Sequence, residues 1–97
     1  MKIKVFVSEE QVLKEVEGVA TTWGELKALL STQGINTSDV KASVRENGTS
    51  FDADNAPLPV GIGKDINNNP NGFDFTLFLN PVKTKSGQGN LLVINTL

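Results

Sequence analysis

The segment from Thr22 to Leu30 reads TWGELKALL, and it predicts the first turns of a helix. Thr22 and Glu25 occupy the positions of a capping box, in which a hydroxyl and a carboxylate each satisfy an unpaired backbone N–H. Gly34 suits the left-handed position just past the helix end. We expect roughly three turns that bury one apolar face against a sheet, because the apolar side chains recur at spacings of three and four: Trp23, Leu26, Leu29 and Leu30.

Two short segments before this helix alternate with the two-residue period of half-buried strands. Residues 2–7 read KIKVFV and place Ile3, Val5 and Val7 on one face, with Phe6 on the other beside two lysines. Residues 12–17 read VLKEVE, and Gly18 closes them. The economical interpretation is a hairpin that opens the fold.

The chain after the helix predicts a second hairpin and a central strand. Residues 40–44 alternate, Asn47-Gly48 is a strong hairpin signal, and residues 49–51 would form the return strand. From residue 52 to 72 the composition predicts an irregular surface segment, with three apolar anchors: Leu58, Val60 and Ile62. Residues 73–79, FDFTLFL, form the most apolar strand, which we place centrally in the sheet, and Pro81 ends it.

Length and composition predict one domain followed by an arm. The chain has 97 residues, of which 38% are hydrophobic, and residues 1–82 are assigned to the domain. Residues 83–97 form the arm, which begins with a polar spacer over residues 83–90. Four apolar residues follow the spacer, and water solvates such residues poorly, so we expect a partner or a neighbouring strand to cover them: Leu91, Leu92, Val93 and Ile94.

The residue types exclude several classes of function. The chain has no Cys and no His, which excludes thiolate nucleophiles, disulfides, Cys/His zinc sites and the Ser-His-Asp arrangement. The formal charge is −2 without a dense basic run, so nucleic-acid binding is not expected. We find neither a signal segment nor an apolar stretch of membrane-spanning length. We therefore expect a cytoplasmic protein that is not an enzyme, needs no cofactor or metal, and does not act at a membrane.

Three polar motifs in the irregular segment are better explained as turns than as sites. Residues 61–64, GIGK, resemble a phosphate-binding loop, but the first glycine and the metal-binding Ser or Thr are missing. Residues 65–76 resemble a calcium loop, but Pro70 stands where that loop needs Gly. Asp52 and Asp54 have no basic or metal-binding companion in the sequence.

Trp23 is interpreted as a lid over the core, with an interface anchor as the alternative.

The order of the predicted elements resembles the ubiquitin-like β-grasp superfamily. Residues 23–30, WGELKALL, look like the helix of the sulfur-carrier proteins of molybdopterin and thiamine synthesis. Residues 47–52 with Pro57-Leu58, and residues 75–82, FTLFLNPV, are similar to later segments of those carriers. The resemblance covers roughly residues 1–86 and implies an α+β fold, in which a mixed sheet of four to five strands packs on one helix.

The chain departs from these carriers at the C-terminal end of the resemblance. The carriers use a terminal Gly-Gly, whereas this chain continues through Gly87 and Gly89 without a diglycine. Our leading hypothesis is a non-enzymatic protein–protein interaction or assembly module, an accessory or structural component of a larger complex, which binds through its sheet face and arm. The partner would be another protein or a second copy bound through residues 91–94, although these residues could also add a strand to their own sheet. The alternative is a ubiquitin-like modifier or sulfur-carrier precursor that is cleaved after Gly87 or Gly89.

Overall fold

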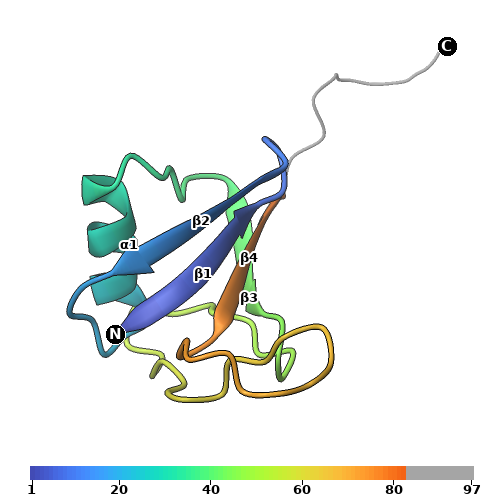
Figure 1. Ribbon diagram of the computed structural model, residues 1–97. Coiled ribbons are helices and arrows are strands. Elements are labelled where there is room, and N and C mark those ends of the chain that lie inside the picture. Colours follow the sequence, from blue (N-terminus) through green and yellow to red (C-terminus); the bar gives the residue numbers. More distant parts are fainter. Residues whose placement is uncertain (83–97) are drawn as a thin grey trace, which may run out of the picture.

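The computed structural model describes residues 1–82, and these form a sheet with one helix on one of its sides (Figure 1). The architecture is α+β, as the sequence predicts. The elements follow the predicted order: β1 Lys2–Val7, β2 Val12–Glu17, α1 Trp23–Thr32, β3 Val40–Val44 and β4 Thr76–Pro81.

The sheet is mixed and has four strands in the order β2-β1-β4-β3. β1 pairs with β2 and β3 pairs with β4 in antiparallel fashion, whereas the two central strands, β1 and β4, run parallel. The opening hairpin and the central position of the most apolar strand are therefore confirmed. A parallel pair needs a crossover connection, which here comprises β2, α1, β3 and the long segment that precedes β4.

The helix begins at the predicted capping residue. The Thr22 hydroxyl accepts a hydrogen bond from the Glu25 backbone N–H at 3.3 Å. The Glu25 carboxylate reaches one residue further upstream than a capping box would place it, because it accepts from the N–H of Thr21 at 2.8 Å and from the Thr21 hydroxyl at 2.9 Å. These hydrogen bonds hold the pKa of the Glu25 carboxyl below its ordinary value. Gly34 has a φ of +78°, as expected for the residue that ends the helix.

The core lies between α1 and the sheet face that carries the predicted inward residues. Leu26 and Leu30 are completely buried, whereas Leu29 is only partly buried at the edge of the core. Trp23 is 6% exposed, so it belongs to the core, as the lid interpretation expects. The largest fully buried side chains come from α1 and from all strands except β2, with one residue just before β4: Ile3, Val5, Leu26, Leu30, Val44, Phe75, Leu77 and Leu79.

Three details of the predicted fold are wrong. Residues 49–51 form no strand of the sheet and make only an isolated bridge, Ser43 to Ser50, with two backbone hydrogen bonds to β3. Val60 is 74% exposed and anchors nothing, unlike Leu58. The last strand begins at Thr76 and not at residue 73, and the carbonyls of Phe73 and Asp74 accept hydrogen bonds from the N–H groups of Gly63 and Ile62 in the preceding loop, respectively.

Within residues 1–82, no helix is long and apolar enough to cross a membrane.

Candidate functional site

The outer face of the sheet, opposite α1, carries an apolar cluster. The alternation that buries Val5 and Leu77 places Phe6 of β1 and Phe78 of β4 on this face, in direct register. The two rings meet edge to face, with centroids 5.8 Å apart and planes at 65°. Leu13 of β2, which is 56% exposed, stands opposite Phe6 in the antiparallel register. An aromatic–aliphatic row therefore crosses three strands on a face that water contacts.

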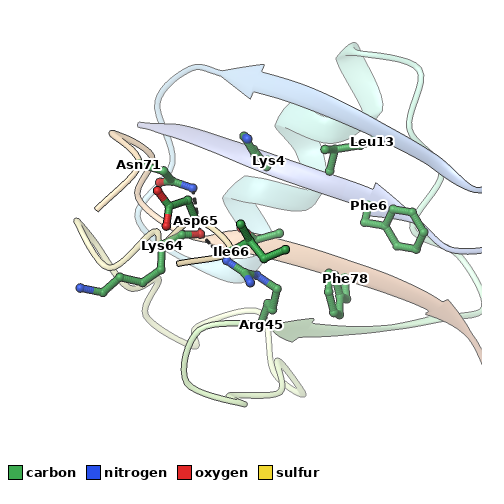
Figure 2. A pocket seen from close by; sticks show the side chains of 10 residues that line it. Lys4, Phe6, Leu13, Arg45, Lys64, Asp65, Ile66, Asn71 and Phe78 are labelled. Carbon is green, nitrogen blue, oxygen red and sulfur yellow. Dashed lines mark hydrogen bonds between the residues drawn. The ribbon is translucent and has the colours of Figure 1, made fainter. Parts of the chain in front are cut away.

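A loop from Lys64 to Asn71 lies beside this row and borders an open hollow of about 470 Å³. Ile66 of the loop is 95% exposed, and Figure 2 shows its side chain over the sheet, between Lys4 and Arg45. A singly exposed aliphatic side chain is common on protein surfaces, but Ile66 borders the same hollow as Phe6 and Phe78 and so extends their apolar surface. The hollow is lined by strand, turn and loop residues: Lys4, Phe6, Leu13, Arg45, Lys64, Asp65, Ile66, Asn71, Thr76 and Phe78.

The charged groups around the hollow are already engaged with protein atoms. Lys4 places its ammonium 5.0 Å from the centroid of the Phe73 ring. Arg45 donates to the Lys64 carbonyl and, at 3.1 Å, to the Glu46 carboxylate. In Figure 2 the ammonium group of Lys64 extends away from the other lining side chains. Lys4 and Arg45 thus bring positive charge to the rim, and the Glu46 carboxylate offsets that of Arg45.

The acidic residue of the lining, Asp65, is hydrogen-bonded within its own loop. One carboxylate oxygen of Asp65 accepts from the N–H groups of Asn67 at 2.8 Å and Asn69 at 2.9 Å. This is the Asx-turn chemistry expected for the segment that resembles a calcium loop. In the described part of the chain, no group of three or more Asp or Glu residues could hold a metal ion.

The other polar motifs have structural roles in the described residues. Gly61 turns the chain with a φ of +70°, and Gly63 is buried against the backbone of Phe73. Asp54 pairs with Lys27 of the helix at 2.6 Å and therefore has the basic companion that the sequence did not indicate. This exposed ion pair joins the loop to α1, and Asp54 therefore does not form a carboxylate pair with Asp52.

The residues proposed from the sequence as partner-binding, Leu91–Ile94, and the candidate processing sites, Gly87 and Gly89, lie outside the described residues. The sheet-face hollow is the site that the structure adds. The alternation in the sequence already placed Phe6 and Phe78 on the opposite face of their strands from the inward apolar residues. The pairing of these two rings depends on the parallel register of β1 and β4, which local patterns do not encode.

Comparison with protein-family models, with curated proteins and with solved structures finds no match to this chain.

Proposed function

We propose that this chain is a non-enzymatic protein–protein interaction module, which binds a protein partner on the outer face of its sheet. The observation that carries the proposal is the Phe6–Phe78–Leu13 row with Ile66 standing over it. Four large apolar side chains around one hollow would gain free energy from burial, at about 25 cal/mol per Å² of apolar surface. Aromatic side chains in such positions are typical interface hot spots.

We further propose that the fold is a β-grasp. The parallel central pair, the antiparallel outer strands and the single helix on one face all agree with the resemblance in the sequence. A fold assignment alone does not define a function, so the binding proposal depends on the site itself.

The chemistry of the hollow favours binding over catalysis. Its acidic residue, Asp65, holds its own loop through one carboxylate oxygen, and Arg45 is tied to Glu46 and to the Lys64 carbonyl. Nucleophilic catalysis needs a base beside a nucleophile, and the lining includes no Ser, Cys or His residue. The side chains that face solvent here are chiefly phenyl and aliphatic groups with cationic neighbours.

We infer that the partner inserts an aliphatic or aromatic side chain between Ile66 and the Phe6–Phe78 pair, with a carboxylate close to it. The lining includes three cationic residues, Lys4, Arg45 and Lys64, against the acidic Asp65, and the Glu46 carboxylate pairs with Arg45, so positive charge remains in excess. Such a rim would favour an acidic flank on the partner and disfavour a basic one. The arm residues Leu91–Ile94 remain a second proposed contact, made either to the same partner or to a second copy.

Site-specific photocrosslinking in cells of the native source tests this proposal. We expect p-benzoylphenylalanine at position 13 to give a discrete protein adduct, mapped to a partner segment with an apolar residue beside Asp or Glu. The matched control is the same label at position 19, because Val19 is 91% exposed but is not among the residues that line the hollow. Phe78→Ser should abolish the adduct at position 13 while the chain stays folded. Equal labelling from both positions, or an adduct that survives Phe78→Ser, would rule out the proposed surface.

A further inference from the structure

Glu46 is a carboxylate that is buried although it lies in the turn of a hairpin. It follows β3 directly and precedes the Asn47-Gly48 turn, where a charged side chain would normally point into water. Its side chain is only 4% exposed. Burying a carboxylate is costly unless several donors satisfy it, so the contacts of Glu46 need an explanation.

The Glu46 carboxylate accepts hydrogen bonds from three separate parts of the fold. Oε1 accepts from the backbone N–H of Thr76 at 2.8 Å, and Oε2 accepts from the Thr76 hydroxyl at 2.8 Å. Oε2 also accepts from the backbone N–H of Lys64 at 3.3 Å and from Arg45 at 3.1 Å. One side chain therefore joins the first residue of β4, the base of the 64–71 loop and the hairpin turn.

The loop that carries Ile66 has few other attachments to the fold. Within the described chain, the hydrogen bonds of Asp65, Asn67, Asn68 and Asn69 stay inside that segment. At the start of the loop, the Lys64 N–H donates to Glu46, and the Lys64 carbonyl accepts from Arg45 and from the Asn71 side chain. At its end, Asn71 donates its N–H to the Gly63 carbonyl and accepts from the Phe73 N–H, so Lys64 is the attachment to the hairpin turn and β4. Arg45 is itself paired with Glu46. Two of the three bonds at Lys64 thus depend on this carboxylate.

We infer that Glu46 is the positioning residue of the proposed binding surface, because it holds the Lys64–Asn71 loop and its Ile66 side chain over the Phe6–Phe78 pair. This inference rests on the proposed function, since it assigns a role toward the partner that the surface binds. A neutral side chain at this position cannot perform the same task. In Glu46→Gln, one end of the amide is itself a donor, and it would face a donor of Thr76, Lys64 or Arg45.

Protonation should have a similar effect to that substitution. Burial alone would raise the pKa of the Glu46 carboxyl, but the hydrogen bonds from Thr76 and Lys64 outweigh burial and hold this pKa below its ordinary value. The stabilisation is therefore complete above the unfolded-state pKa of about 4.3, and it is lost as the pH falls from there through the lower folded-state pKa. The charged groups that face Glu46 are Arg45, Lys64 and Asp65. Asp65 is a second carboxylate at this site, so it requires its own control.

The first arm of the test measures the loop without any partner. Amide hydrogen exchange of Lys64 should be about ten-fold or more faster in Glu46→Gln, because its N–H loses a charged acceptor. The amides of Val5 and Leu77, in the central strands, should exchange at nearly unchanged rates. Thr76→Val removes only the hydroxyl donor, so it should give a smaller change of the same kind if Glu46→Gln fails to fold.

A pH series then separates positioning from general stability. The amide shifts of Lys64 and Thr76, whose N–H groups donate to Glu46, should show a transition below about pH 4.3 that is absent in Glu46→Gln and retained in Asp65→Asn and Glu17→Gln. Unchanged Lys64 exchange in Glu46→Gln, or a transition lost only in Asp65→Asn, would overturn the inference.

The second arm measures photocrosslinking from position 13 in the folded Glu46→Gln chain. A several-fold loss of adduct, together with the faster Lys64 exchange, is the expected result. Full adduct yield despite a released loop would overturn the positioning role and leave the proposed function standing. Absence of adduct in the wild-type chain would instead remove the proposed function, and with it the assigned role of Glu46 toward a partner.

Discussion

Trp23 stacks on Phe51, with ring centroids 5.2 Å apart and planes at 16°. Phe51 in turn meets Phe75 edge to face at 6.2 Å. The stack connects the first turn of α1 with the segment that follows the Asn47-Gly48 hairpin, in addition to the isolated bridge between Thr22 and Pro57. It therefore compensates for the missing return strand, since residues 49–51 are held to β3 by only two backbone hydrogen bonds.

A double-mutant cycle should detect this stack as coupling. We expect Trp23→Leu and Phe51→Leu to be non-additive by about 0.5–1.5 kcal/mol in the free energy of unfolding, because each single change already removes the aromatic pair. Urea denaturation of the wild type, both single variants and the double variant gives the coupling directly. Additivity within about 0.3 kcal/mol would mean that the two rings contribute only through independent burial.

The helix leucines should differ in their contribution to stability. Leu26 is completely buried between helix and sheet, whereas Leu29 lies at the edge of the core and is partly exposed. Leu26→Ala should cost about 2–5 kcal/mol, and Leu29→Ala should cost clearly less because its site can relax into solvent. Equal losses in chemical denaturation would show that Leu29 is docked as deeply as Leu26.

Local patterns in the sequence were sufficient to predict most of the elements. The capping Thr22, the three-and-four spacing and the alternation of residues 2–7 and 12–17 all depend on near neighbours, and each appears in the structure at the predicted place. The errors lie where distant segments compete. Residues 73 and 74 alternate like a strand, yet β4 starts at Thr76, and the carbonyls of residues 73 and 74 pair with the loop at residues 63 and 62.

The candidate site was much harder to predict, because it depends on long-range contacts. Glu46 appears in the sequence as an ordinary hairpin-turn residue, and its burial arises only because Thr76, 30 residues later, aligns beside β3. Ile66 lies in a segment whose composition predicts only polar turns. Its position over the sheet follows from the attachment of Lys64 to the hairpin, which no local spacing indicates.

Gly63 should be intolerant of any side chain. An added Cβ would lie 2.4 Å from the Phe73 carbonyl oxygen and 2.9 Å from its carbonyl carbon, backbone atoms that cannot rotate away. Gly63→Ala should therefore cost about 1–3 kcal/mol by overpacking, through a shift of the loop that leads to β4. Gly34→Ala is a useful reference, since its Cβ would meet nothing within 4 Å and only the φ of +78° opposes it. A Gly63→Ala chain as stable as the wild type would show that the close approach to Phe73 is relieved at no cost.

The last prediction separates the assembly module from the carrier alternative, through the fate of residues 90–97. A chain that ends at Gly89 should fold like the full chain, because the buried core found in residues 1–82 extends no further than Leu79. It should nevertheless bind a partner more weakly if the arm contributes to the interface. Leu91, Leu92, Val93 and Ile94 would each contribute about 1.5–3 kcal/mol when fully buried, an upper bound reduced by the entropy of ordering the spacer.

Intact mass of the protein from its native source, together with urea denaturation of the truncated chain, distinguishes the outcomes. The module hypothesis expects Leu97 to be retained and the truncated chain to unfold at the wild-type urea concentration. Native chains that end at Gly87 or Gly89, or that carry an isopeptide bond from either glycine to a lysine, would replace it with the modifier or carrier function. A truncated chain that is destabilised by several kcal/mol would instead assign residues 91–94 to the domain itself, because a solvated tail contributes little to the unfolding free energy of an isolated monomer.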